Sequence, residues 1–197
     1  MRRALQYLRA SHGVGSTYAW IGVGHSCGAT LLAQLVAGMA PLPLEETKDS
    51  ARGPASLVLM AGIYDLRLML ANHQPPSCPA HIAQIYEEFV QGAFGDGVAD
   101  GGGYDAVSPS HGAYAPDVCP SVKEVVLAYS PEDELIEPQQ REVMAARLKL
   151  CGWVERGQNG ERVVEIKDLT DGHDEVWQDG RQVAGLIGEA VGRMFGA

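Results

Sequence analysis

The feature that most constrains the fold is the stretch 18–32, YAWIGVGHSCGATLL, in which an apolar run stops at Gly-His-Ser-Cys-Gly and a helix-forming run begins at once. Residues 18–23 are rich in strand formers and show no alternation, which is typical of a strand buried on both faces of a parallel sheet. Residues 27–39 are almost wholly apolar and predict a buried helix. Ser26 therefore lies at the turn between them, where a strained G-x-S-x-G elbow lifts a serine hydroxyl clear of the sheet.

The rest of the chain alternates between predicted strands and helices. Further strands are predicted at 55–63, 122–129 and 162–166, and helices at 2–10, 81–94, 138–150 and 176–195. This alternation predicts an α/β fold with a parallel, doubly wound sheet. Residues 64–120 interrupt it with prolines and a glycine-rich segment. We interpret them as an excursion over the sheet edge and expect a cap over a pocket.

Size and charge limit the classes of protein that this chain can represent. A chain of 197 residues fits one domain with a sizeable core. The net charge of -10 disfavours nucleic acid and anionic membrane surfaces as partners. The four cysteines are scattered without metal-like spacing, which favours a reducing compartment. No apolar run approaches the roughly 20 residues of a membrane helix, and the start of the chain is a poor signal peptide. We expect a cytoplasmic protein with a small-molecule substrate.

A serine nucleophile needs a histidine to take its proton and a carboxylate to orient that histidine. After a G-x-S-x-G elbow, these partners follow in the order serine, acid, histidine. Among the histidines, His25 adjoins the elbow serine and is expected to point elsewhere, whereas His173 alone lies in the loop after the last predicted strand. His173 is therefore the candidate base; the alternative is a solvated loop histidine between Asp171 and Asp174. The six histidines are His12, His25, His73, His81, His111 and His173.

The candidate acids lie in the loop that follows the strand predicted at 122–129. This loop contains Glu132, Asp133 and Glu134 in succession. Asp133 is our choice, but composition does not distinguish among the three carboxylates, and a solvated acidic turn is the structural alternative.

Cys27 is the first residue of the helix that follows the elbow. Its backbone amide is expected to donate a hydrogen bond to an oxyanion, aided by the positive end of the helix dipole. Nothing nearby in the sequence is placed to lower the pKa of its thiol, so the side chain is interpreted as a packing residue.

Five further patterns stand in order along the chain: GHSCGATL at 24–31, AGIYDL at 61–66, VSPS at 107–110, YSPEDELI at 129–136 and GHDEVW at 172–177. Taken together and in this order, these segments resemble kynurenine formamidase of the fungal type, an arylformamidase among the α/β-hydrolases. The resemblance places the family's nucleophile on Ser26, its acid on Asp133 and its histidine on His173. It implies hydrolysis of N-formyl-L-kynurenine to L-kynurenine and formate, a step of tryptophan breakdown, without metal or cofactor. Tyr129 departs from the pattern, in which a histidine is usual.

One part of the family pattern has no counterpart here. The oxyanion motif, His-Gly-Gly followed by Trp, belongs on a strand upstream of the elbow, and this sequence contains no such segment. We therefore expect residues 1–197 to form a single, N-terminally truncated α/β-hydrolase domain whose elbow strand lies at one edge of the sheet. An apolar edge strand invites pairing, so a homodimer through this edge is expected. The alternatives are a general carboxylesterase and a catalytically weak remnant that acts as a binding module.

Overall fold

A computed structural model describes residues 2–15, 18–39, 53–95 and 103–196. Their strands form one parallel sheet in the order β1-β2-β3-β5-β4. The strands are β1 Ile21–His25, β2 Ser56–Met60, β3 Glu124–Tyr129, β4 Val154–Glu155 and β5 Val163–Asp168. The helices are α1 Arg2–His12, α2 Cys27–Val36, α3 Leu66–Asn72, α4 Ala80–Phe94, α5 Gln139–Leu150, α6 His173–Asp179 and α7 Arg181–Phe195, with short 3-10 turns at Gly103–Ala106 and Pro109–His111.

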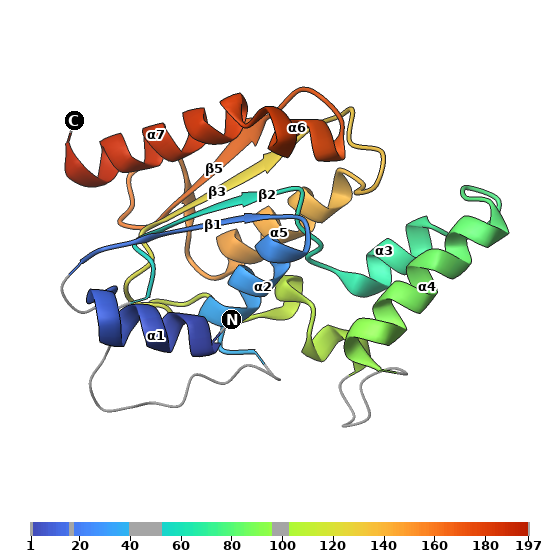
Figure 1. The fold of residues 1–197 in the computed structure, drawn as a ribbon, viewed down its shortest axis with the longest axis horizontal. Coiled ribbons are helices and arrows are strands. Elements are labelled where there is room, and N and C mark those ends of the chain that lie inside the picture. Colours follow the sequence, from blue (N-terminus) through green and yellow to red (C-terminus); the bar gives the residue numbers. More distant parts are fainter. Residues whose placement is uncertain (1, 16–17, 40–52, 96–102, 197) are drawn as a thin grey trace.

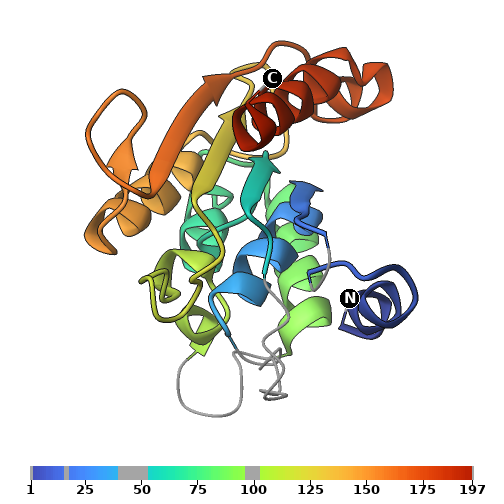
Figure 2. The ribbon, with the colours of Figure 1, turned by 90° about the vertical axis from the view of Figure 1, so that its left-hand side faces the viewer.

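Helices cover both faces of this sheet, as Figures 1 and 2 show. On one face, α2 and α5 pack against alternate residues of β2 and β3, among them Leu57 and Leu127. On the other face, α6 and α7 pack against Val58 and Val126. The pair α3 and α4 projects beyond the ends to which β1 and β2 point (Figure 1). The predicted doubly wound α/β architecture is therefore confirmed.

The strand register brings three loops to the same end of the sheet, where the carboxyl ends of the strands lie. Every residue of β2 and β3 is buried, which explains their unbroken apolar sequences. Parallel pairing aligns His25 of β1 with Met60 of β2, and Tyr129 of β3 with Asp168 of β5. The turn after β1, the loop after β3 and the loop after β5 thus leave from the carboxyl ends of neighbouring strands, where open α/β sheets bind their ligands.

The structure also differs from the predicted elements. The first strand begins at Ile21 and runs through His25, later than the predicted 18–23. The predicted helix 176–195 is wrong as one element, because Gly180 takes a left-handed conformation with φ of 70° and separates α6 from α7. Helix α3 and strand β4 were not predicted. The cap role of residues 64–120 stays a prediction, and residues 96–102 of that segment lie outside the described ranges.

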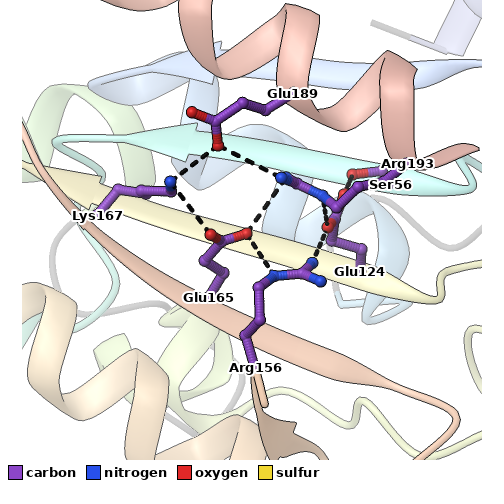
Figure 3. Close-up of polar contacts among 7 residues, drawn as sticks. All are labelled: Ser56, Glu124, Arg156, Glu165, Lys167, Glu189 and Arg193. Carbon is purple, nitrogen blue, oxygen red and sulfur yellow. Dashed lines mark hydrogen bonds and ion pairs between the residues drawn. The ribbon is translucent and has the colours of Figure 1, made fainter. Parts of the chain in front are cut away.

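A charged network fastens α7 to the sheet (Figure 3). Glu124 at the start of β3 bonds to Arg193 of α7 at 2.6 Å. Lys167 of β5 bonds to Glu189 of α7 at 2.8 Å and to Glu165 of its own strand at 3.2 Å. Equal numbers of acidic and basic groups meet, so the network is neutral. Its members are Glu124, Glu165, Glu189, Arg156, Lys167 and Arg193, with the Ser56 hydroxyl.

Candidate functional site

Ser26 occupies a strained turn between β1 and α2. Its backbone has φ of 52° and ψ of -126°, a conformation that residues other than glycine rarely adopt. The amide of Ser26 donates to the carbonyl of Met60 in β2 at 2.9 Å, which fixes the turn to the sheet. Ser26 is the N-cap residue of α2, yet its hydroxyl makes no capping hydrogen bond. The hydroxyl is therefore not committed to stabilising the helix.

Gly24 allows the strand and the helix to approach closely. A Cβ atom at this position would lie 2.7 Å from backbone atoms of Gly28 and Ala29, which is too close for any side chain. At Gly28, by contrast, a Cβ atom would meet nothing within 4 Å among the described residues. The first glycine of the G-x-S-x-G pattern is thus required by packing at the elbow, whereas the second is not.

Asp133 and His173 form a hydrogen-bonded pair across the carboxyl end of the sheet. Nδ1 of His173 lies 2.8 Å from Oδ2 of Asp133, and the two side chains are 5 % and 2 % exposed. An ionised carboxylate only accepts, so Nδ1 is the donor. The other oxygen, Oδ1, accepts from the amides of Leu135 and Ile136, both at 2.9 Å. These bonds leave Nε2 of His173 as the ring nitrogen available to a substrate or a nucleophile.

The hydrogen bond between Asp133 and His173 sets the direction in which the pKa of each group shifts. Burial alone would lower the pKa of His173, but the hydrogen bond and charge of Asp133 outweigh burial and raise it above its ordinary value. Burial alone would raise the pKa of Asp133, but the bonds from His173, Ile136 and Leu135 outweigh burial and lower it. The arrangement therefore favours an imidazolium beside a carboxylate.

The neighbours of Asp133 hold the same histidine in other ways. Oε2 of Glu134 accepts from the backbone amide of His173 at 3.0 Å, and this bond lowers the pKa of Glu134. The Ser130 hydroxyl donates to the carbonyl of Asp171 at 2.6 Å and accepts from the amide of Glu132 at 3.1 Å. Of the three carboxylates that composition left open, Asp133 is the one that contacts the imidazole. Sequence reasoning missed the bridging role of Ser130.

The expectation that His25 points away from the other candidate residues is wrong. Its ring lies with its centroid 4.5 Å from that of His173, and the two planes are tilted by 48°. The contact arises because β1 ends beside the loop that carries α6. Among the described residues no hydrogen bond joins the Ser26 hydroxyl to His173, so the structure brings β1 and α6 together through the rings of His25 and His173.

Gln140 of α5 is a second residue that sequence reasoning did not assign. Its buried side-chain oxygen accepts from the amides of Tyr64 and Asp65, both at 2.7 Å, and its amide group donates to the carbonyl of Asp65 at 2.9 Å. These bonds fix the loop after β2, and Asp65 in turn caps α3 through the amide of Leu68 at 3.0 Å. A glutamine in a helix carries no sequence signal for such a role.

Cys27, the predicted oxyanion donor, is the first residue of α2. Its side chain is exposed, so the interpretation of this side chain as a packing residue is wrong. Elsewhere, the described ranges contain no group of three or more His, Cys, Asp or Glu side chains that could hold a metal ion. Within the same ranges, no helix combines the length and the apolar character that crossing a membrane requires.

Most of this chain is similar in sequence to known proteins. No family model matches the chain. It is 31 % identical over 188 residues to a kynurenine formamidase-like hydrolase of Fusarium equiseti, covering 95 % of this chain and 56 % of that protein. It is 30 % identical over 192 residues to a kynurenine formamidase of Aspergillus versicolor, covering 90 % and 61 %. The chain thus spans somewhat more than half the length of these relatives.

Solved structures give the fold. An acetyl ester-xyloside bifunctional hydrolase from Caldicellulosiruptor lactoaceticus superposes with a TM-score of 0.59 at 12 % identity, covering 98 % of this chain and 62 % of that one. The solved structures that resemble this chain are α/β-hydrolases. Their fold agrees with the parallel sheet and the flanking helices described above. The chain therefore has the α/β-hydrolase fold, and over most of its length its sequence is similar to kynurenine formamidase-like hydrolases.

Proposed function

We propose that the chain carries the catalytic residues of a serine hydrolase of the kynurenine formamidase type. Its reaction would be the hydrolysis of N-formyl-L-kynurenine to L-kynurenine and formate. The observation that carries the proposal is the buried hydrogen bond between Asp133 and His173, which lies at the same sheet edge as the strained turn at Ser26. The similarity to proteins named kynurenine formamidase supports the choice of substrate.

In the proposed mechanism, Oγ of Ser26 attacks the formyl carbon while Nε2 of His173 takes the hydroxyl proton. Asp133 holds Nδ1 and stabilises the imidazolium that forms. The amide of Cys27 donates to the oxyanion of the tetrahedral intermediate. His173 then protonates the departing arylamine, and water, activated by the same histidine, attacks the formyl ester on Ser26 to release formate and restore the serine.

Oxyanion stabilisation sets the expected rate. The proposal assigns one donor, the amide of Cys27, and a site that lacks one oxyanion donor typically turns over about 10²- to 10³-fold more slowly. The chain spans about three fifths or less of the length of its relatives. That the isolated chain is active is therefore itself a proposal.

A fluorophosphonate probe tests the nucleophile directly. We expect the folded chain to be labelled at Ser26, located by mass spectrometry, and the Ser26→Ala variant to remain unlabelled. Turnover of N-formylkynurenine relative to a p-nitrophenyl ester then separates a formamidase from a general carboxylesterase. If a well-folded chain is never labelled, the proposal that it is an enzyme is overturned. A binding module is then the remaining interpretation.

A further inference from the structure

We propose that His25 is a positioning residue that holds the imidazole of His173 in the plane needed for proton transfer with Ser26. This inference rests on the proposed role of His173 as the base. The observation behind it is the contact between the two rings, whose centroids lie 4.5 Å apart. His25 directly precedes Ser26 in the chain, so the contact links the strand that carries the nucleophile to the helix that carries the base.

The hydrogen bonds of His173 leave one motion of its ring unrestrained. Asp133 holds Nδ1 at 2.8 Å, and Glu134 holds the backbone amide at 3.0 Å. Both bonds come from the loop after β3, on one side of the residue. They fix its position, but they resist only weakly a rotation of the ring that swings Nε2 sideways. The ring of His25, whose centroid lies 4.5 Å from that of the imidazole, opposes that rotation by steric contact.

His25 is itself held in place by α6. Trp177, one helical turn beyond His173, stacks on His25 with centroids 6.1 Å apart and planes 18° apart. Helix α6 therefore contributes two rings that contact the same residue of β1. Contact with two rings restricts the rotation of His25 more than contact with one ring would.

The surroundings of His25 keep it neutral. Burial, followed by the charge of His173, lowers the pKa of His25, and the charge of Asp133, a hydrogen bond with the backbone of His173 and the charge of Asp174 oppose this only in part. Nε2 of His25 is buried and has no hydrogen-bond partner among the described residues. The ring-to-ring contact with His173 does not involve Nε2 of His25, so we expect phenylalanine, which keeps a flat ring, to replace His25 in this role.

Two substitutions separate the flat ring from the polar atom. In His25→Ala we expect kcat to fall by about 10- to 100-fold with little change in KM, as misplacement of a catalytic group predicts. In His25→Phe we expect kcat to stay close to wild type. His81→Ala is the matched control, because His81 is an exposed histidine on α4. Wild-type kcat in His25→Ala, or an equal loss in His25→Phe, would overturn the proposal.

A readout that does not require turnover distinguishes this proposal from the proposed function. In protein with ¹⁵N-labelled histidine, the Nδ1 proton of His173, assigned by its absence in His173→Gln, should be protected in wild type and in His25→Phe. In His25→Ala it should exchange with solvent. If wild type fails to label with fluorophosphonate, the proposed function fails, whereas these spectra still decide the role of His25.

A folding defect in His25→Ala would not leave the question open. His25→Leu keeps most of the volume but removes the flat ring. A folded leucine variant, judged by near-ultraviolet circular dichroism, should lose protection of the His173 proton. Retained protection in that variant would contradict the proposal.

Discussion

At the residue scale, adjacent carboxylates hold one histidine through different groups. Asp133 binds the ring of His173, and Glu134 binds its backbone amide. We predict that Asp133→Asn lowers kcat by about 10³- to 10⁴-fold, because an amide stabilises the imidazolium poorly and favours the wrong tautomer. Steady-state kinetics on N-formylkynurenine check this, with Glu132→Gln as the control. Unchanged turnover in a folded Asp133→Asn variant would move the acid to Glu132 or Glu134.

The raised pKa of His173 predicts the pH dependence of the reaction. Neutral His173 is the base, so kcat/KM should fall as pH drops through the pKa of the free enzyme, which lies above the ordinary 6.5. In Asp133→Asn the group that contributes most to raising this pKa is gone and burial remains, so the acidic limb should move to lower pH. An acidic limb at or below pH 6.5 in the wild type would contradict the assignment of His173 as the base. An acidic limb at the same pH in the wild type and in Asp133→Asn would contradict it as well.

At the scale of elements, the charged network holds α7 through two largely buried carboxylates of the sheet, Glu124 and Glu165. Glu124 is 10 % exposed and bonds to Arg156, Arg193 and Ser56, whereas Glu189 of the same network is 47 % exposed. We predict that Glu124→Gln lowers the free energy of unfolding by about 2 kcal/mol, because it leaves buried charge poorly compensated. Glu189→Gln should cost less than about 1 kcal/mol. Urea unfolding measures both, and equal losses would count against a role for burial.

Some of the strands and helices could be predicted from the sequence, and others could not. The strands β2 and β3 were predictable because unbroken apolar runs are required where both faces are covered. Parallel strands also place the residues that follow them at one end of the sheet, so the position of Ser26, Asp133 and His173 at that end was predictable. The break at Gly180 was not predictable, since a single glycine within a helical pattern is usually tolerated. The contact of His25 depends on how β1 meets α6, a tertiary relation that local sequence does not encode.

At the scale of the whole molecule, β1 is the outermost strand on one side of the sheet that the described residues form. The carbonyl of Trp20 accepts from Ala55, and the amide of Ser26 donates to Met60, both at 2.9 Å. Backbone groups alternate in direction along a strand, so the amides and carbonyls of Ile21 and Val23 point away from β2. No Asp, Glu, Lys or Arg occurs between Gly13 and Leu44. This edge therefore lacks the charges that commonly prevent strand pairing.

We propose that β1 pairs with β1 of a second copy, antiparallel about a two-fold axis. Because each chain carries a net charge of -10, the dimer should strengthen with added salt, which shortens the Debye length to about 10 Å at 0.1 M. Ile21→Pro removes an outward amide at the first residue of β1, where proline is tolerated. It should weaken the dimer at least about tenfold, or roughly 1.4 kcal/mol.

Sedimentation velocity over a concentration series measures this association at low and high salt. Leu150→Lys is the control, because Leu150 is 81 % exposed on α5, and its replacement removes apolar surface away from β1. The control should dimerise like wild type apart from a small change due to net charge. A wild-type chain that stays monomeric at every concentration, or an Ile21→Pro variant that associates as tightly, would show that the two sheets do not join through β1.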